Sequence, residues 1–361
     1  MKSVKLGNHI LEVPIIQGGM GVGVSLSNLA GNVAKKGGMG VISAAHPGYR
    51  KTNFRTENIK ANYDAIIEEV TKAKEIANGK GLVGVNIMVA GREYAKMVEA
   101  TVKAKADAII SGAGLALDLP KLVNGASILL SPIVSSGKAM RLIAKVWEKR
   151  HNYFPDFVVV EGSKAGGHLG FKEEDLFSGN CPSLEEILVE VDSELAPYRE
   201  KANRPIPIFV AGGIYDGCDI AHYIKKGADG VQIGTRFIAT YECDADEAFK
   251  EAVISCTESD IGFVKSPSGF PGRAIINSFV KKTREAGNIS MKNCLNCMIP
   301  CNPSDTVYCI SEALIQSVSG NVDKGLIFVG ETAARVNEMN SVSDLIDSLI
   351  RETDLCLGEI L

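Results

Sequence analysis

The chain of 361 residues contains no apolar run of the length, roughly 18 residues, that a membrane-spanning helix requires. Neither sign of charge is in excess, because 39 basic residues stand against 43 acidic ones and no stretch concentrates Lys and Arg among aromatic residues. These absences argue against a membrane protein and against a nucleic-acid partner.

The N-terminal segment also lacks an export signal. Charged or polar side chains recur every few positions, and no small-residue cleavage site follows. In such a chain we expect the nine cysteines to be reduced thiols or metal ligands rather than disulfides. The sequence therefore predicts a soluble cytoplasmic protein. Its oligomeric state, for which a homodimer is one expectation, does not follow from composition.

Short runs rich in β-branched residues recur along the chain, and each ends in small or polar residues. They span 13–20, 38–44, 82–88, 107–114, 126–136, 156–162, 206–213 and 229–237. Their hydrophobicity is continuous rather than alternating, which is typical of parallel strands covered on both faces. Amphipathic helical patterns lie between them, as at 62–80 and 137–150. Eight such strands predict an α/β fold, a (β/α)8 TIM barrel, with a doubly wound open sheet as the alternative.

The pattern changes after residue 242. Residues 243–320 hold six of the nine cysteines and show no clear strand–helix alternation, whereas 325–336 and 341–352 look like barrel elements again. We therefore expect a barrel made of 1–242 and 321–361, with 243–320 inserted as a lid or substrate domain.

Two glycine-containing turns end the seventh and eighth predicted strands, where barrels build phosphate sites. They supply Gly212, Gly213, Gly234 and Thr235. Glycine lets backbone N–H groups approach an anion, and the helix after the first turn is expected to add its positive end. The alternative is that these glycines only shape tight turns.

Small residues also end the first, third and fourth strands, in QGGM (17–20), GVN (84–86) and SGAG (111–114). Such gaps leave room for a flat ligand across the barrel mouth. Combined with a phosphate site, they favour a planar phosphate-bearing cofactor, FMN, over a bare sugar phosphate. The sequence does not predict a Rossmann dinucleotide-binding motif, because GMGVGV (19–24) lacks the G-x-G-x-x-G spacing.

One of the five histidines, His168, follows a glycine-rich turn, AGGH, at the end of the sixth strand. A turn without bulky side chains lets the imidazole lean over a ligand, and histidine suits proton transfer near neutral pH. A lone histidine is more often structural, but the glycine flanks favour function here. The other histidines are His9, His46, His151 and His222. Of these, only His46, which lies just after the second predicted strand, is an alternative candidate for the catalytic residue.

These segments resemble the nitronate monooxygenase (2-nitropropane dioxygenase) family, which includes the flavin-dependent enoyl-acyl-carrier-protein reductases. The resemblance rests on VVVEGSKAGGHLGF, VAGGIYDG, VQIGTRF and PIIQGGMG, and covers about 10–240 with 266–277 and 325–333. It implies a barrel that holds FMN, with a histidine, His168, as acid or base above the flavin. By matching positions, the implied FMN contacts are Gly19, Met20, Asn86, Gly112, Gly166, Gly167, Gly212, Gly213, Gly234 and Thr235.

One feature departs from this family. Residues 294–309 space Cys294, Cys297, Cys301 and Cys309 as C-x2-C-x3-C-x7-C. Four thiolates this close in sequence can surround an iron–sulfur cluster or a zinc ion. The alternative, which stays open, is that they are free thiols of a lid. A cluster would favour an electron-accepting flavoenzyme over a user of oxygen.

Three functions are therefore carried forward, all acting on a small-molecule substrate. The first is FMN-dependent oxidation of alkyl nitronates or nitroalkanes. The second is an FMN- and NAD(P)H-dependent enoyl reductase, with the cluster as an optional centre. The third is a flavin-free phosphate-binding lyase or isomerase, which would need a Schiff-base lysine such as Lys164 or paired carboxylates.

Overall fold

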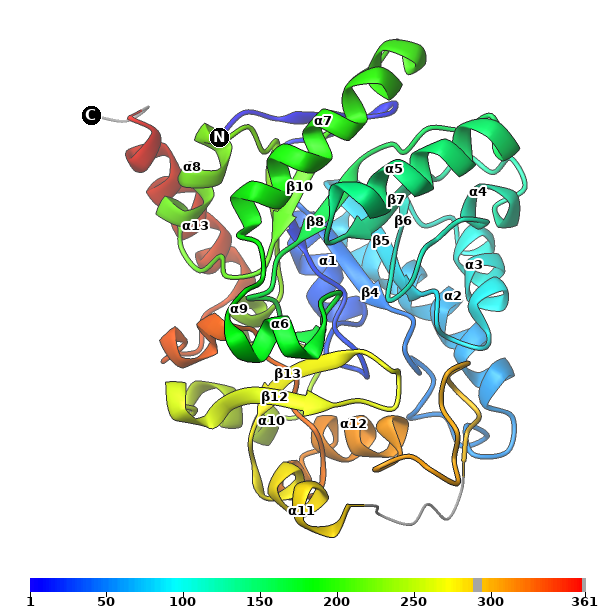
Figure 1. Cartoon of the computed structure of the whole chain (residues 1–361), viewed down its shortest axis with the longest axis vertical. Coiled ribbons are helices and arrows are strands. Elements are labelled where there is room, and N and C mark those ends of the chain that lie inside the picture. The colour runs from blue at the N-terminus through cyan, green and yellow to red at the C-terminus, as the bar shows by residue number, and fades with distance from the viewer. Residues whose placement is uncertain (288–293, 359–361) are drawn as a thin grey trace.

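The computed structural model describes residues 1–287 and 294–358. Eight parallel strands form a closed barrel in the order β10–β11–β3–β4–β5–β6–β7–β8 (Figure 1). They are Ile15–Gln17 (β3), Met39–Ser43 (β4), Leu82–Met88 (β5), Ala108–Gly112 (β6), Leu129–Val134 (β7), Val158–Glu161 (β8), Ile208–Ala211 (β10) and Gly230–Ile233 (β11). Each strand lies within one of the eight apolar runs, so the predicted TIM barrel is confirmed and the open sheet is wrong.

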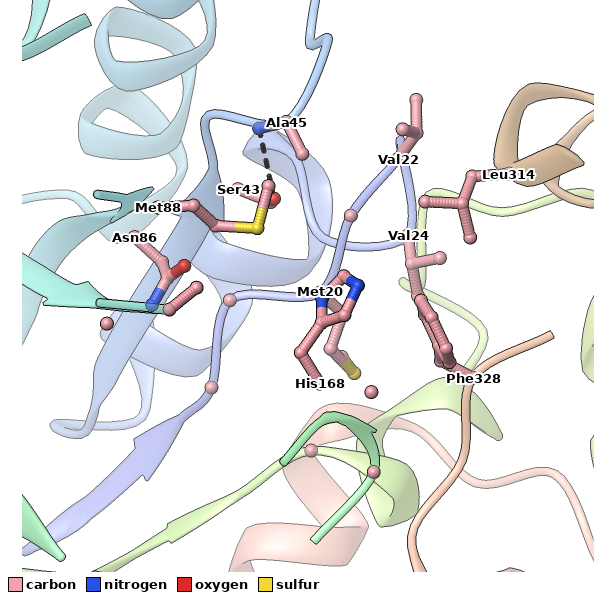
Figure 2. A pocket seen from close by; sticks show the side chains of 18 of the residues that line it. Met20, Val22, Val24, Ser43, Ala45, Asn86, Met88, His168, Leu314 and Phe328 are labelled. Atoms are coloured by element: carbon pink, nitrogen blue, oxygen red, sulfur yellow. Dashed lines mark hydrogen bonds between the residues drawn. The ribbon is translucent and has the colours of Figure 1, made fainter. Parts of the chain in front are cut away.

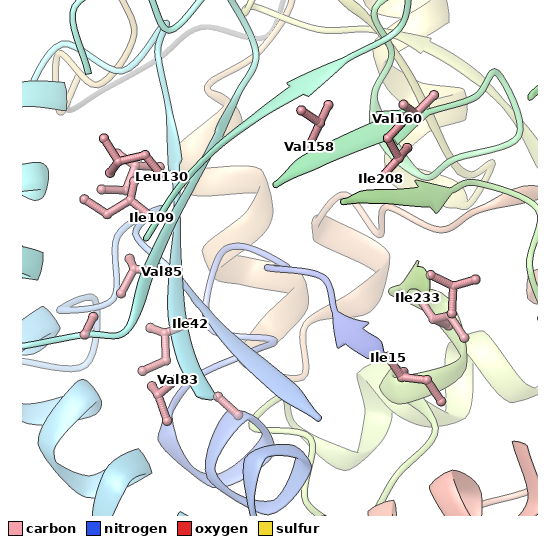
Figure 3. Packing of buried hydrophobic residues seen from close by; sticks show 14 of the residues in the cluster. Ile15, Ile42, Val83, Val85, Ile109, Leu130, Val158, Val160, Ile208 and Ile233 are labelled. Carbon is pink, nitrogen blue, oxygen red and sulfur yellow. The ribbon is translucent and has the colours of Figure 1, made fainter. Parts of the chain in front are cut away.

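Both faces of the barrel strands are buried, which explains their continuous hydrophobicity. Val158 and Val160 point outward into the layer between strands and helices (Figure 3). Val159 points inward and belongs to a second cluster, which also contains Leu6 and Leu11 of an N-terminal hairpin. The hairpin, β1 (Val4–Leu6) and β2 (His9–Leu11), packs on residues at the start of the barrel strands.

Helices surround the barrel. They are α1 (Ser27–Lys35), α2 (Asn58–Ala77), α3 (Tyr94–Lys103), α4 (Leu119–Leu122), α5 (Gly137–Val146), α7 (Leu184–Ala202), α8 (Gly217–Lys225) and α13 (Val342–Leu357). The short helix α6 (Glu173–Ser178), in the connection after β8, packs instead on Phe263. Helix α13 packs against α8 and α1 and so completes the ring after β11. Within the described residues, no helix has the length and apolar character needed to cross a membrane.

Between β11 and α13 the chain forms a separate layer below the barrel in Figure 1. Its elements are α9 (Thr235–Ile238), α10 (Glu247–Ile254), β12 (Ile261–Lys265), β13 (Pro271–Ile275), α11 (Ser278–Ala286) and α12 (Ile310–Val318). Strands β12 and β13 form an antiparallel sheet with β9 (Gly167–His168), which belongs to the turn after β8. The domain borders at 242/243 and 320/321 stay a prediction.

Residues 325–336 do not form the barrel element that their sequence suggests. Phe328 makes an isolated antiparallel bridge to Ala274, and Glu331–Arg335 form a 3-10 helix. The physical reason is that β11 already pairs with β3, which leaves no free edge for another strand.

The expectation that the cysteines form no disulfide is wrong for one pair. Cys218 of α8 and Cys356 of α13 are bonded, with Cα atoms 5.4 Å apart, although the two residues are 138 positions apart in the chain. Only the packing of α13 on α8 brings these two thiols together, so composition and spacing could not show it.

Candidate active site

A cavity of about 560 Å³ lies between the carboxyl ends of the barrel strands and the inserted layer, which comprises the described elements between β11 and α13. All ten predicted FMN contacts line it, and so does His168. The inserted layer supplies further walls, among them Leu295, Ser311 and Leu314. Figure 2 shows His168 in the cavity wall, with Phe328 to one side of it. The structure therefore brings together residues that the sequence scatters over more than 200 positions.

The turn after β10 has the backbone shape expected of an anion site. Gly212 and Gly213 have φ values of +98° and +87°, which side chains rarely adopt. Gly234, after β11, has ordinary φ, and a Cβ there would meet nothing closer than Met20 Sδ at 3.5 Å. Thr235 Oγ1 accepts a hydrogen bond from Gly330 N at 2.8 Å, which leaves its hydroxyl hydrogen available to an acceptor.

The positive end of α8 is not offered to a ligand as expected. Asp216 Oδ1 accepts a hydrogen bond from Asp219 N at 3.0 Å, and the Asp219 side chain bonds back to the backbone N–H of Asp216. Two carboxylates thus occupy the first turn of α8 (Gly217–Lys225). An anion in this part of the cavity would rely on the glycine turns instead.

Small residues on the other side of the cavity allow segments to approach closely. A Cβ on Gly19 would overlap Asn86 Cβ, and one on Gly166 would overlap the backbone of Val329. Gly112 is tighter than usual against Ile133, at 3.0 Å. Gly19 and Gly166 therefore serve packing as well as shaping the cavity.

His168 is held at the cavity wall by the inserted layer. Its Nε2 atom lies 2.7 Å from Ser266 Oγ, and its ring meets the edge of Phe328 with centroids 5.1 Å apart. Burial lowers the pKa of His168 to about 4, so the imidazole is neutral at physiological pH.

The competitor His46 has a different environment, although it also lines the cavity. Its Nδ1 bonds Asn62 Nδ2 at 3.2 Å, and its Nε2 bonds Ser311 Oγ at 2.7 Å. Burial is the main cause that lowers the pKa of His46 to about 4, and the positive charge of Arg55 lowers it further. Both ring nitrogens are occupied by protein partners, whereas His168 has one such partner among the described side chains. This arrangement favours a structural role for His46.

Two polar cavity residues were not singled out from the sequence. Burial raises the pKa of Glu161, at the end of β8, to about 8. Gln232 of β11 carries a buried Oε1 atom with no hydrogen-bond partner in the described part of the chain. In the sequence, each is a polar residue directly after an apolar run near the end of a barrel strand, and this pattern could have marked both as candidate site residues.

The cysteine loop closes over the cavity near the β5–α3 connection. Met298 forms an antiparallel bridge with Gly91, and Ile299 N donates to Ala90 O at 2.9 Å. Cys294 and Cys297 line the cavity, but Cys301 and Cys309 do not. Nowhere in 1–287 and 294–358 do three His, Cys, Asp or Glu side chains converge on a point where a metal could bind. The described residues therefore do not assemble the predicted metal site.

Burial raises the pKa of the Cys297 thiol to about 11. A hydrogen bond with the Ser311 side chain lowers the pKa, but this effect is smaller than that of burial. This thiol is therefore protonated at neutral pH.

Comparisons with known proteins identify the family of this chain. The model of the nitronate monooxygenase family matches residues 2–352. A probable nitronate monooxygenase of Staphylococcus aureus is 27% identical over 300 residues, covering 75% of this chain and 78% of that protein. A carboxyl-CoA dehydrogenase of Rhodococcus jostii is 24% identical over 279 residues, covering 77% of this chain and 67% of that one.

Solved structures show the same fold. FabK from Thermotoga maritima has a TM-score of 0.74 at 23% identity, covering 97% of this chain and 95% of that chain. A nitroalkane oxidase from Streptomyces ansochromogenes has a TM-score of 0.73 at 20% identity, covering 97% and 98%. The chain belongs to the nitronate monooxygenase family and is an oxidoreductase of this flavin-dependent family.

Proposed function

We propose that this protein is an FMN-dependent oxidoreductase that oxidises alkyl nitronates and nitroalkanes, with His168 in contact with the substrate. The observation that carries the proposal is the cavity itself. One space is lined by the glycine turns after β10 and β11, by the small residues after β3, and by His168. A flavin-free lyase or isomerase is less well supported, because Lys164 is paired with Glu331 at 3.0 Å rather than free to form a Schiff base.

The residues of the cavity fit FMN. The backbone around Gly213 and Gly234, with the free hydroxyl hydrogen of Thr235, would hold the phosphate. Gly19 and Met20 would lie against the ring system. The orphaned Oε1 atom of Gln232 needs a donor, and FMN carries N–H and O–H donors on its ring and side chain. Bound FMN would supply the electron-accepting centre.

The protein's own contribution is to bind, orient and exclude water. Phe328 and Ser266 of the inserted layer hold the imidazole of His168. The ring contact and the hydrogen bond together fix its orientation in the cavity. A neutral imidazole at this place can exchange a proton or a hydrogen bond with the substrate.

A second candidate is reduction of an activated alkene with NAD(P)H as electron donor. The observation that favours it is the apolar part of the lining of the same cavity. Met88, Met97, Leu295 and Leu314 are among the lining residues, and apolar walls of this kind suit a carbon chain longer than that of a simple nitroalkane.

The deciding experiment compares two reactions of the flavin-loaded protein. Oxygen consumption with propyl-2-nitronate in the absence of NAD(P)H is the expected result. Oxidation of NAD(P)H that depends on an added enone or enoyl thioester, with no turnover of the nitronate, would instead establish the second candidate. Absence of flavin from the purified protein would exclude both.

A further inference from the structure

A chain of hydrogen bonds in the loop between β12 and β13 ends on His168. Phe270 N donates to Ser268 Oγ at 3.3 Å, and Ser268 Oγ donates to Ser266 Oγ at 3.0 Å. The backbone N–H of Ser268 also donates to Ser266 Oγ, at 3.3 Å. Ser268 is buried, so water does not compete freely for these bonds.

Counting donors and acceptors decides the direction of the last bond. A hydroxyl oxygen has two lone pairs and one hydrogen. Both lone pairs of Ser266 Oγ are used by Ser268, so its hydrogen is what remains for His168 Nε2 at 2.7 Å. A third accepted bond would leave the Ser266 hydrogen without an acceptor in a half-buried site.

We propose that Ser266, oriented by Ser268, holds His168 in the tautomer that carries its proton on Nδ1, so that the imidazole offers the cavity an N–H donor and not a lone pair. Ser266 and Ser268 are then positioning residues. His46 provides a contrast within the same cavity. Asn62 Oδ1 accepts from Gly48 N at 3.1 Å, so its amide nitrogen donates to His46 Nδ1, and His46 carries its proton on Nε2.

The tautomer bears on the substrate, and this step rests on the proposed function. An N–H donor stabilises negative charge on oxygen, as neutral imidazoles of lowered pKa do in other barrel enzymes. The substrate class that fits is an anion whose charge lies on oxygen beside the reacting carbon, such as a nitronate. Proton abstraction from a neutral nitroalkane needs the lone pair that Ser266 occupies. The protein should therefore prefer the ionised nitronate.

The test reads the tautomer directly. Flavin-loaded protein labelled with ¹⁵N-histidine is studied by long-range ¹H–¹⁵N correlation, with His168→Gln and His46→Gln used to assign the signals. We expect a protonated Nδ1 and an unprotonated Nε2 for His168, and the opposite pattern for His46 as the internal control. In Ser266→Ala the His168 pattern should change to a mixture, whereas Ser266→Thr, which keeps the hydroxyl, should preserve it.

A kinetic measurement accompanies the spectrum. In Ser266→Ala the ratio of turnover on the ionised nitronate to turnover on the nitroalkane should fall by about fivefold, the order expected for one neutral hydrogen bond. Ser259→Ala, at an exposed serine of the same layer, is the matched control and should leave the ratio unchanged.

Two outcomes are separable. A proton on Nε2 of His168 in the wild-type protein overturns the inference, whatever the protein turns over, and this spectrum is decisive even if the variants do not fold. The expected tautomer together with no nitronate turnover leaves the inference standing and rejects the proposed function.

Discussion

His168 stands opposite Gly272 in the antiparallel register of β9 (Gly167–His168) and β13 (Pro271–Ile275). Next to this pair, Leu169 N donates to Pro271 O at 2.8 Å. The turn that follows barrel strand β8 is therefore also the edge of the sheet in the inserted layer. Any movement of that sheet would move the imidazole relative to the barrel, so the two layers must dock before the site is complete.

Removing the imidazole should slow the reaction without emptying the site. In His168→Ala we expect kcat/KM on the ionised nitronate to fall roughly 100- to 1,000-fold, the cost of losing one donor to a developing oxyanion. Flavin content and melting temperature should stay close to wild type, because His168 lies in the cavity wall and not in the hydrophobic core of the barrel. Steady-state oxygen consumption measures the effect. A nitronate rate that is spared while the nitroalkane rate collapses would instead indicate a general base.

A side chain at Gly234 should displace the cofactor and leave the fold intact. The added Cβ would find ordinary space in the protein, 3.5 Å from Met20 Sδ, but would intrude where the phosphate is proposed to lie. Gly234→Val is therefore expected to lose most of its bound FMN after dialysis, measured by absorbance. Circular dichroism is the control for folding. Full flavin retention would place the phosphate elsewhere.

Stability should decrease with pH through Glu161. Burial raises the pKa of this carboxyl to about 8, above its value in the unfolded chain. Between pH 4.5 and 8 the folded state keeps a proton that the unfolded state has released, so the free energy of unfolding falls as pH rises through this window. We expect the melting temperature of Glu161→Gln to fall less than that of wild type over the same range. Parallel curves for the two proteins would contradict the assignment.

The thiols of the cysteine loop should differ in reactivity. Cys294 is exposed, whereas burial raises the pKa of Cys297 to about 11. Iodoacetamide at pH 8 should therefore label Cys294 well before Cys297, as followed by peptide mass spectrometry. Protein purified without oxygen should contain no stoichiometric iron or zinc. Uniform protection of Cys294, Cys297, Cys301 and Cys309 that a chelator abolishes would mean that a metal assembles them.

The sequence was sufficient for the barrel. Strands covered on both faces produce continuous apolar runs, and this local signal located all eight of them. The AGGH turn also singled out His168, which lines the cavity in the structure, since glycine marks places where the backbone must turn tightly or approach a ligand; its role in the reaction stays a prediction.

Properties that depend on contacts between distant segments were decided only by the tertiary structure. His46 and Ser311 are 265 positions apart, and no periodicity in the sequence reveals that the serine hydroxyl is hydrogen-bonded to the histidine ring. The raised pKa of Glu161 comes from burial by the whole cavity wall, and the bond between Cys218 and Cys356 comes from the docking of α13 on α8. Four closely spaced cysteines suggested a metal site, but spacing along a chain does not set the direction in which side chains point. Local pattern determined the elements and their order, whereas long-range packing determined which polar groups meet.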